Sequence, residues 1–363
     1  MKTERLFSLD LLRGLDMFVL VALTHVVWAA HDAWGLPQAF VHQFTHPWGG
    51  FTFNDIIMPL FIFMCGAAIP LAVPKRLTPD GRPTAAFWKH LVSRVAMLWI
   101  FGMIVQGHLL TLDPMKISPY NNTLQTIAFG YFFASLAYLC PKRWIRPAIA
   151  VGCFVVYGLI MAFCGDYSQD GNAAQLFEQA VLRHLVPAGS EAFKTGTYTW
   201  FLTGFMFVAM SLCGSVSTEI LQNNNQSGWR KAGTLAAAGL GELAIGWLLV
   251  LRVPMIKQFF SVSFTLQAMG WCTLALAALY ALTDVLRFRR GFSLFLLYGR
   301  HALFAYMLAN VFGKAFETAA EKIACADGLA LHFGKPFSMF AGAIAYVVLL
   351  TAFLKAKDAS AGR

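Results

Sequence analysis

Charged residues are scarce in this sequence. Only 13% of its 363 residues are Asp, Glu, Lys or Arg, whereas soluble domains average about 25%. Hydrophobic residues make up 58% of the chain, again beyond the usual soluble range. This composition excludes an ordinary soluble domain and indicates an integral membrane protein that contacts a lipid bilayer.

Several sequence motifs are also absent. The chain contains no phosphate-binding glycine loop, no dinucleotide-binding fingerprint, no CxxC pair and no zinc-ligand spacing. We therefore expect neither a soluble-type cofactor nor a metal. Most of the seven cysteines lie in or beside apolar segments, which argues against a disulfide scaffold. A pair between Cys164 and Cys325, which fall on the same predicted side, stays open.

The apolar segments predict an all-α, polytopic membrane helix bundle. Windows of about 20 apolar residues are needed to cross the hydrocarbon core. Ten such windows occur, at roughly 8–30, 52–73, 87–111, 120–140, 144–164, 197–218, 229–251, 261–284, 293–313 and 336–355. Internal repeats, low-complexity segments and long linkers are absent, so residues 1–363 are expected to form a single domain.

Lys and Arg residues predict the orientation of the chain. Alternate connections between the ten segments hold sixteen of them, and the other connections hold eight. Because cytoplasmic loops carry the excess of Lys and Arg, both termini should be cytoplasmic. The net charge of +10 is spread over these short loops and does not favour nucleic acid as a partner.

Histidines gather on one predicted side. Seven of the nine, among them His25, His46 and His108, lie at or beyond the outer ends of the expected helices. This pattern favours an outer vestibule that handles protons or binds sugars. The alternative for each single histidine is an ordinary interfacial position.

The segment from His46 to Gly66 holds the first candidate site. His46 and Trp48 precede a Gly-Gly turn, and a helix that carries Asp55 near its start follows. A charge in a membrane helix is a functional-site hypothesis, because burying it in lipid costs free energy. His46 is a candidate general base oriented by Asp55, with Trp48 and Asn54 as substrate-binding candidates. The alternative is a re-entrant loop in which Asp55 caps or pairs a helix.

Two further clusters lie at predicted cytoplasmic helix ends. Asp10 and Arg13 are one helical turn apart, and together with Asp16 they exclude a cleavable apolar signal segment. Arg13 is a candidate for binding a phosphorylated ligand, and the alternative is a structural ion-pair network. Arg300 and His301 are candidates for binding donor phosphates, and the alternative is that they snorkel toward lipid headgroups.

A third cluster contains two amides and a histidine. His108 lies at the outer end of one expected helix, and Asn122 and Gln125 enter the next. Such amides can bind sugar hydroxyls or a developing oxyanion. They can equally join helices by hydrogen bonds, and both interpretations stay open.

The order of these motifs resembles that of a known family. The chain contains Ser8-x-Asp10-x-x-Arg13-Gly14, His46-Pro-Trp48-x-Gly50-Phe-Thr52-x-x-Asp55-x-x-x-Pro59-x-Phe61-x-Phe63, Asn122-Thr-Leu-Gln125-x-Ile-Ala-x-Gly130-Tyr131, Ser263-Phe264 with Gly270-Trp271, and Gly299-x-x-Ala302-Leu303. Together they resemble the transmembrane acyltransferases related to heparan-alpha-glucosaminide N-acetyltransferase. The resemblance is greatest to a bacterial branch catalogued as a domain of unknown function.

The resemblance implies that His46 acts at the non-cytoplasmic face, with acetyl-CoA supplied from the cytoplasm and an amino sugar outside. Two departures from the family pattern affect the site. His46 stands two residues before Trp48 rather than three, and Thr24-His25 occupies the place of an asparagine near the end of the first span. His25 is therefore a candidate substitute for that asparagine.

The function expected from the resemblance is an acetyl-CoA-dependent transmembrane N-acetyltransferase of the bacterial inner membrane. Its acceptor would be the amino group of a periplasmic hexosamine or hexosamine-terminated glycan. The alternatives are an O-acyltransferase of envelope glycans and an amino-sugar transporter. Transporters often show repeated halves with interrupted helices, and the gathering of ionisable residues at the two ends favours the enzyme. The sequence leaves the oligomeric state open, and a homodimer is one of the alternatives.

Each candidate residue has an expected role in this reaction. His46 is the general base or a transient acetyl carrier, and Asp55 orients it. His25, His108 and Gln125 are candidates for stabilising the oxyanion. Substrate-binding candidates are Trp48, Asn54, His108, Asn122 and Gln125, and candidates for the CoA site are Asp10, Arg13, Arg300 and His301.

Overall fold

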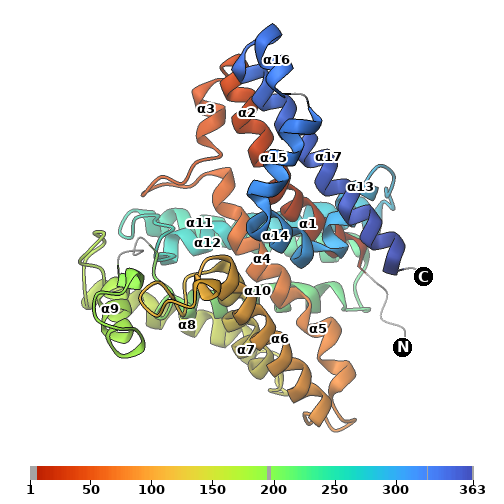
Figure 1. Ribbon diagram of the computed structural model, residues 1–363. Helices are drawn as coiled ribbons and strands as arrows, with labels where there is room; N and C mark the ends of the chain where they lie inside the picture. Colours follow the sequence, from red (N-terminus) through yellow and green to blue (C-terminus); the bar gives the residue numbers. More distant parts are fainter. Residues whose placement is uncertain (1–5, 194–197, 325, 362–363) are drawn as a thin grey trace. The chain divides into compact units, whose positions relative to one another are not determined.

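The structure is a computed structural model that describes residues 6–193, 198–324 and 326–361 (Figure 1). It is 74% helical, and two isolated β-bridges join loop residues. The predicted fold class, an all-α polytopic membrane bundle, is confirmed. Cys325, the residue considered as a partner for Cys164, lies outside the described residues.

The described chain divides into two compact units. The first, called here the central unit, comprises Pro47–Phe51 and Met58–Ala281. The second, the terminal unit, comprises Leu6–His46, Thr52–Ile57 and residues 282–361. Each unit draws on separate segments of the sequence, so neither is a contiguous piece of chain. The single domain expected over residues 1–363 stays a prediction.

Long apolar helices form most of the central unit. They are α4 (Ile57–Ala67), α5 (Ile69–Ala72), α6 (Ala85–Val105), α7 (Thr123–Tyr138), α8 (Ile145–Phe163), α9 (Ala173–Leu185), α10 (Gly204–Leu221), α11 (Gly228–Val250) and α12 (Val262–Tyr280). Single turns η3 (Pro74–Arg76), η4 (Leu109–Thr111) and η5 (Glu191–Phe193) lie between them. Side chains cap several helices: Thr84, Ser227 and Ser261 accept hydrogen bonds from first-turn N–H groups of α6, α11 and α12.

Helix α10 organises the central unit. It packs against α7, α8, α11 and α12, and most of its residues are buried. Small residues allow its close crossing with α4. A Cβ at Gly66 would collide with the carbonyl of Ser211, and a Cβ at Gly214 would collide with that of Phe63. Glycines let helix backbones approach closely in a membrane, where dispersion contacts rather than the hydrophobic effect hold helices together.

The terminal unit combines the start and the end of the chain. Its helical segments are α1 (Phe7–Phe18), the π-helical turn η1 (Val19–Leu23), α2 (Thr24–Trp34), α3 (Gln38–His42), the 3-10 turn η2 (Phe53–Ile56), α13 (Ser293–Arg300), α14 (Ala302–Val311), α15 (Gly313–Ile323), α16 (Ala326–Phe333) and α17 (Lys335–Ala361). A second π-helical turn, η6 (Ala281–Val285), continues from α12 into this unit. Helices α2, α15 and α16 pack along α17 (Figure 1).

Two motif glycines meet in the terminal unit. A Cβ on Gly14 of α1 would collide with the carbonyl of Phe295 on α13, and Gly299 of α13 faces the backbone of Asp10 and Gly14. The carboxylate of Asp284 accepts hydrogen bonds from the N–H groups at the start of α1. The Asp-x-x-Arg-Gly motif therefore has a packing reason for its glycine, because only Gly allows this approach.

Helix lengths give fewer spans than the ten expected. Within the described residues, eight helical segments are long and apolar enough to cross a membrane, and nine if the bent pair α13–α14 is one span. That pair bends by 77° at His301. The segment expected over 120–140 forms α7, which has only 16 residues. The exact number of spans and the cytoplasmic termini stay predictions.

Candidate functional site

Two stretches of the terminal unit, residues 43–46 and 52–55, are joined by hydrogen bonds. The backbone N–H of Asn54 donates to the carbonyl of Gln43 at 2.9 Å, and that of Phe53 donates to the Gln43 side chain at 3.2 Å. Thr52 Oγ1 lies 2.9 Å from the carbonyl of Thr45. These contacts close a loop at whose base residues 43–46 lie beside residues 52–55.

This closure brings His46 to Asp55. His46 Nδ1 lies 2.9 Å from Asp55 Oδ1, and the Asn54 amide nitrogen lies 3.0 Å from His46 Nε2. A carboxylate only accepts hydrogen bonds, so the Nδ1 atom carries the proton and Nε2 accepts from Asn54. The His46 side chain is 44% exposed and that of Asp55 is 2% exposed. The arrangement is an accessible imidazole held by a buried carboxylate.

Asp55 also caps its own helical turn. Its second oxygen accepts from the Thr52 N–H at 2.9 Å and lies 3.0 Å from Thr52 Oγ1. The two residues form a capping box at the start of η2. The same carboxylate therefore fixes the helix start and the imidazole, which leaves the orientation of His46 little freedom.

Trp48 belongs to the central unit. There Gly50 donates to the carbonyl of Met255 at 3.0 Å, and Gly49 pairs with Ile256 in an isolated bridge. Gly50 has φ +107°, a conformation that favours glycine. The Trp48 ring meets Phe259 edge to face at 6.2 Å between centroids. Its indole is thus packed on a loop of the central unit.

The amide cluster is saturated by local hydrogen bonds. Asn122 is the N-cap of α7: its Oδ1 accepts from the Leu124 N–H at 2.7 Å, and its Nδ2 donates to Gln106 at 2.8 Å. Gln125 Oε1 accepts from the Asn122 N–H at 3.1 Å, and its amide donates to the carbonyl of Pro119 at 2.7 Å. Both side chains are buried. Such bonding is typical of a capping box rather than of groups held ready for a ligand.

His108 is distinguished by its backbone conformation. It follows α6 with φ +52°, a left-handed conformation that costs a non-glycine residue about 1 kcal/mol or more. Its side chain is exposed, and its carbonyl accepts a hydrogen bond from Thr111 Oγ1 at 2.7 Å. The structure thus places His108 in an exposed turn of the central unit, directly after α6.

The candidates for the CoA site are engaged in ion pairs. Arg300 Nη1 lies 2.8 Å from Asp358 Oδ2, and His301 Nε2 lies 3.0 Å from the other oxygen of Asp358. Asp10 and Arg13 are 3.9 Å apart on α1. Asp358 lies near the end of α17, so its pairing with Arg300 could not be expected from local spacing. The Arg300 and Arg13 side chains remain 47% and 35% exposed.

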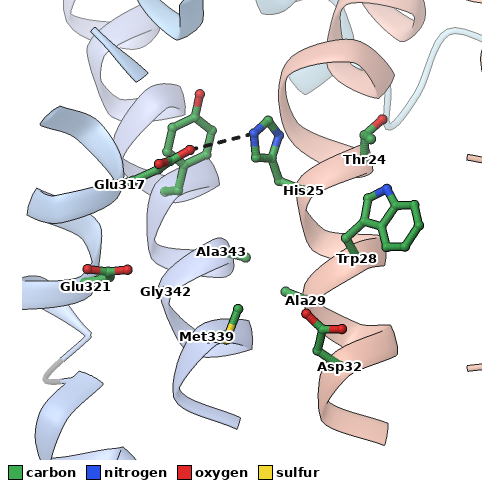
Figure 2. Close-up of a pocket in the computed structure, with 11 residues that line it drawn as sticks. Thr24, His25, Trp28, Ala29, Asp32, Glu317, Glu321, Met339, Gly342 and Ala343 are labelled. Carbon is green, nitrogen blue, oxygen red and sulfur yellow. Dashed lines mark ion pairs between the residues drawn. The ribbon is translucent and has the colours of Figure 1, made fainter. Parts of the chain in front are cut away.

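His25 lies in a different setting of the terminal unit. Its ring stacks on Tyr346 of α17 at 5.3 Å, and its Nε2 lies 4.0 Å from the carboxylate of Glu317 on α15 (Figure 2). The sequence reasoning missed Glu317 and its neighbour Glu321. Their spacing of four residues places both on one face of α15, which was the available signal.

Glu178 of α9 is a further residue that the sequence reasoning missed. Its Oε2 accepts from the N–H groups of Trp200 and Phe201 at 2.9 and 3.0 Å. Burial raises the pKa of this carboxyl to about 7, although the two N–H donors oppose the shift. Burial and the nearby Glu178 also raise the pKa of Tyr120 well above its ordinary value.

The fold and this geometry define a polytopic helical membrane protein with an accessible His–Asp pair. The chain belongs to the family described as Domain of unknown function (DUF5009), which matches residues 5–232. This match includes His46 and Asp55 and ends before α15 and α17. A search of curated proteins found no match. Among the described residues, no three His, Cys, Asp or Glu side chains are grouped to hold a metal ion.

Proposed function

We propose that the protein transfers an acetyl group from acetyl-CoA to the amino group of a hexosamine or hexosamine-terminated glycan. The observation that carries the proposal is the 2.9 Å contact between His46 Nδ1 and the buried Asp55. It directs the basic Nε2 atom away from the carboxylate while the ring stays accessible. General bases for acyl transfer need this combination.

In the proposed reaction, the His46 Nε2 atom takes a proton from the acceptor amine as nitrogen attacks the thioester carbonyl. A C–N bond forms, and the tetrahedral intermediate then collapses with cleavage of the C–S bond. The CoA thiolate leaves and receives the proton from the imidazolium. Asp55 stabilises that imidazolium, because its charge lies against the protonated ring.

Asn54 has a specific part in this proposal. Its amide nitrogen donates a hydrogen bond to His46 Nε2 at 3.0 Å. The acceptor amine must therefore displace this amide before its proton can be transferred. The freed amide N–H then lies beside the reacting atoms, where it can donate to the developing oxyanion. Asn54 is 8% exposed. A hydrogen-bond donor that is shielded from solvent interacts more strongly with a developing charge than one in water.

The donor's phosphates are proposed to meet Arg13 and Arg300. Both guanidinium groups are partly exposed, and guanidinium binds phosphate oxygens through paired N–H groups. Arg300 would exchange Asp358 for a phosphate. With the termini cytoplasmic, as the Lys and Arg distribution predicts, both arginines would face the cytoplasm and His46 the periplasm of a bacterial inner membrane.

Proteoliposomes test the proposal. Acetyl-CoA labelled in the acetyl group is sealed inside, and glucosamine or glucose is added outside. Labelled N-acetylglucosamine outside is the expected product. Acetylated glucose would instead support an O-acyltransferase, and unmodified glucosamine accumulating inside would support a transporter. Protein-free liposomes and the His46→Ala variant are the controls.

A further inference from the structure

A cavity of about 370 Å³ lies within the terminal unit, bounded by α2, α15 and α17 (Figure 2). Cavities of roughly 300–1,000 Å³ are the usual size of small-molecule sites. Its lining includes His25, Trp28, Asp32, Glu317, Glu321 and Tyr346. None of these residues belongs to the His46–Asp55 pair.

The charges that line this cavity are unbalanced. Asp32, Glu317 and Glu321 contribute three carboxylates, and no Lys or Arg is among the described lining residues. His25 is the one basic side chain in that lining, 4.0 Å from Glu317. In the described part of the chain, Asp32 and Glu321 have neither an ion pair nor a hydrogen bond.

The cavity is also lined by aromatic rings and by a hydroxyl group without a hydrogen-bond partner in the described residues. The Tyr346 side chain is buried, with 3% of the residue exposed, yet its hydroxyl has no hydrogen-bond partner within the described ranges. Trp28 lines the cavity from α2 (Figure 2). Aromatic faces beside carboxylates attract organic cations through the ring quadrupole as well as through charge.

The carboxylates of this cavity favour a cationic ligand. Asp32 lies on α2, which belongs to a candidate membrane span, and a carboxylate without a partner costs free energy there. Glu317 and Glu321 lie on α15, where two like charges one turn apart repel each other unless a cation lies between them. No three His, Cys, Asp or Glu side chains converge in the described structure, whereas the aromatic lining suits an organic cation. A protonated amine can contact both Glu317 and Glu321, which lie one turn apart on α15.

We propose that this cavity binds a ligand carrying a protonated primary amine. The ammonium group donates to Glu317 and Glu321, and its carbon body lies against Trp28 and Tyr346. Two sources share this chemistry: a soluble amino sugar and the headgroup of an ethanolamine lipid. The site does not depend on acetyl transfer by His46.

Equilibrium binding tests the proposal on the full chain in nanodiscs of phosphatidylcholine, in the His46→Ala background. Radiolabelled glucosamine is compared with N-acetylglucosamine, which lacks the ammonium group. In a second arm, native mass spectrometry compares retained phosphatidylethanolamine with phosphatidylglycerol. Glu317→Gln and Glu321→Gln are the test variants, and Asp80→Asn, an exposed carboxylate in a loop of the central unit, is the matched control.

We expect the protein to prefer the amine over its comparison probe in at least one arm. The arm that shows this preference identifies the ligand as an amino sugar or as an ethanolamine lipid. Each Gln variant should weaken amine binding by about tenfold, since the amide oxygen still accepts from the ammonium but without the carboxylate charge that strengthens the bond, whereas Asp80→Asn should leave binding unchanged. Equal binding in both arms of the amine and of the comparison probe that lacks an ammonium group, or unchanged binding in both Gln variants, would overturn the proposal. Acetyl transfer is measured separately, in Gln variants that keep His46. If these variants transfer acetyl groups, the proposed function stands even where the binding proposal fails.

Discussion

His46 and Asp55 are nine residues apart in the sequence, and their side chains meet at 2.9 Å between Nδ1 and Oδ1. The contact has one exposed and one buried partner. In addition, the buried carboxylate is held by Thr52 through both a backbone N–H and a hydroxyl. The imidazole is therefore pre-oriented before any substrate arrives, and this arrangement can be tested by substitution.

Loss of the imidazole should remove the activity. We expect His46→Ala to lower kcat for acetyl transfer by at least about 100-fold, because proton transfer loses its base. Asp55→Asn should lower kcat by about 100-fold to 10,000-fold, since the ring loses its orienting charge. His42→Ala, an exposed histidine in the same loop region, is the control. Near-normal turnover by His46→Ala in proteoliposomes would eliminate this residue as the base.

The Thr52 hydroxyl should matter for both stability and turnover. Thr52→Val keeps the shape but leaves Asp55 Oδ2 with one partner fewer, so unfolding should become easier by about 1–2 kcal/mol. The looser carboxylate should also lower kcat. Thr52→Ser retains the hydroxyl and should behave like the wild type. Thermal unfolding and initial rates of the two variants provide the comparison, and identical behaviour would argue against this role.

Asn122 and Gln125 should act on stability rather than on substrate binding. Asn122→Ala removes the N-cap of α7 and should cost about 1 kcal/mol of unfolding free energy. The KM for the acceptor should stay within about twofold, because the substitution removes no contact with the bound acceptor. Asn122→Asp keeps the capping oxygen but loses the amide that donates to Gln106, so comparing the two variants separates these contacts. A large rise in KM without a change in Tm would restore the substrate-binding interpretation.

Arg300 and Asp358 should show opposite effects on the donor. Asp358→Asn frees the guanidinium from its carboxylate, so the KM for acetyl-CoA should fall, whereas Arg300→Ala should raise it. The pair is solvent-accessible, so its loss should leave the stability almost unchanged. The double variant should resemble Arg300→Ala, because the Asp358 effect requires Arg300. Additive effects in this cycle would show that Asp358 does not act through Arg300, and an unchanged KM in Arg300→Ala would remove Arg300 from the donor site.

Glu178 should make stability fall as pH rises. Its carboxyl has a pKa near 7 in the folded protein against an ordinary 4.5. Between those values the folded state holds a proton that the unfolded state has lost, so each pH unit costs up to about 1.4 kcal/mol. Above pH 7 both states are ionised and the dependence should level off.

Glu178→Gln should remove this dependence and raise Tm at pH 8, because the amide oxygen can still accept from the backbone without a buried charge. Thermal unfolding of both proteins from pH 5 to pH 8 measures the difference. Asp170→Asn, which replaces an exposed carboxylate, is the control. A parallel pH profile in the Gln variant would assign the dependence to another group.

Local patterns predicted part of this site, and long-range contacts supplied the rest. His46 and Asp55 could be paired from the sequence because a short loop and a helix start hold both. Asn122 and Gln125 follow the spacing of a capping box, yet the sequence left their role open. Arg300 suggested a phosphate site, but its partner Asp358 lies 58 residues later, and no local pattern predicts that contact.

Composition and apolar periodicity were sufficient to identify a helical membrane protein, because the bilayer accepts only long apolar helices or closed barrels. They also indicated the loop in which His46 meets Asp55. Only the tertiary structure decided that Gly14 packs on α13, that Arg300 holds Asp358, and that carboxylates from α2 and α15 line one cavity. These contacts depend on which helix faces pack together, and in a membrane many apolar faces are nearly equivalent, so small residues and distant polar groups make the choice.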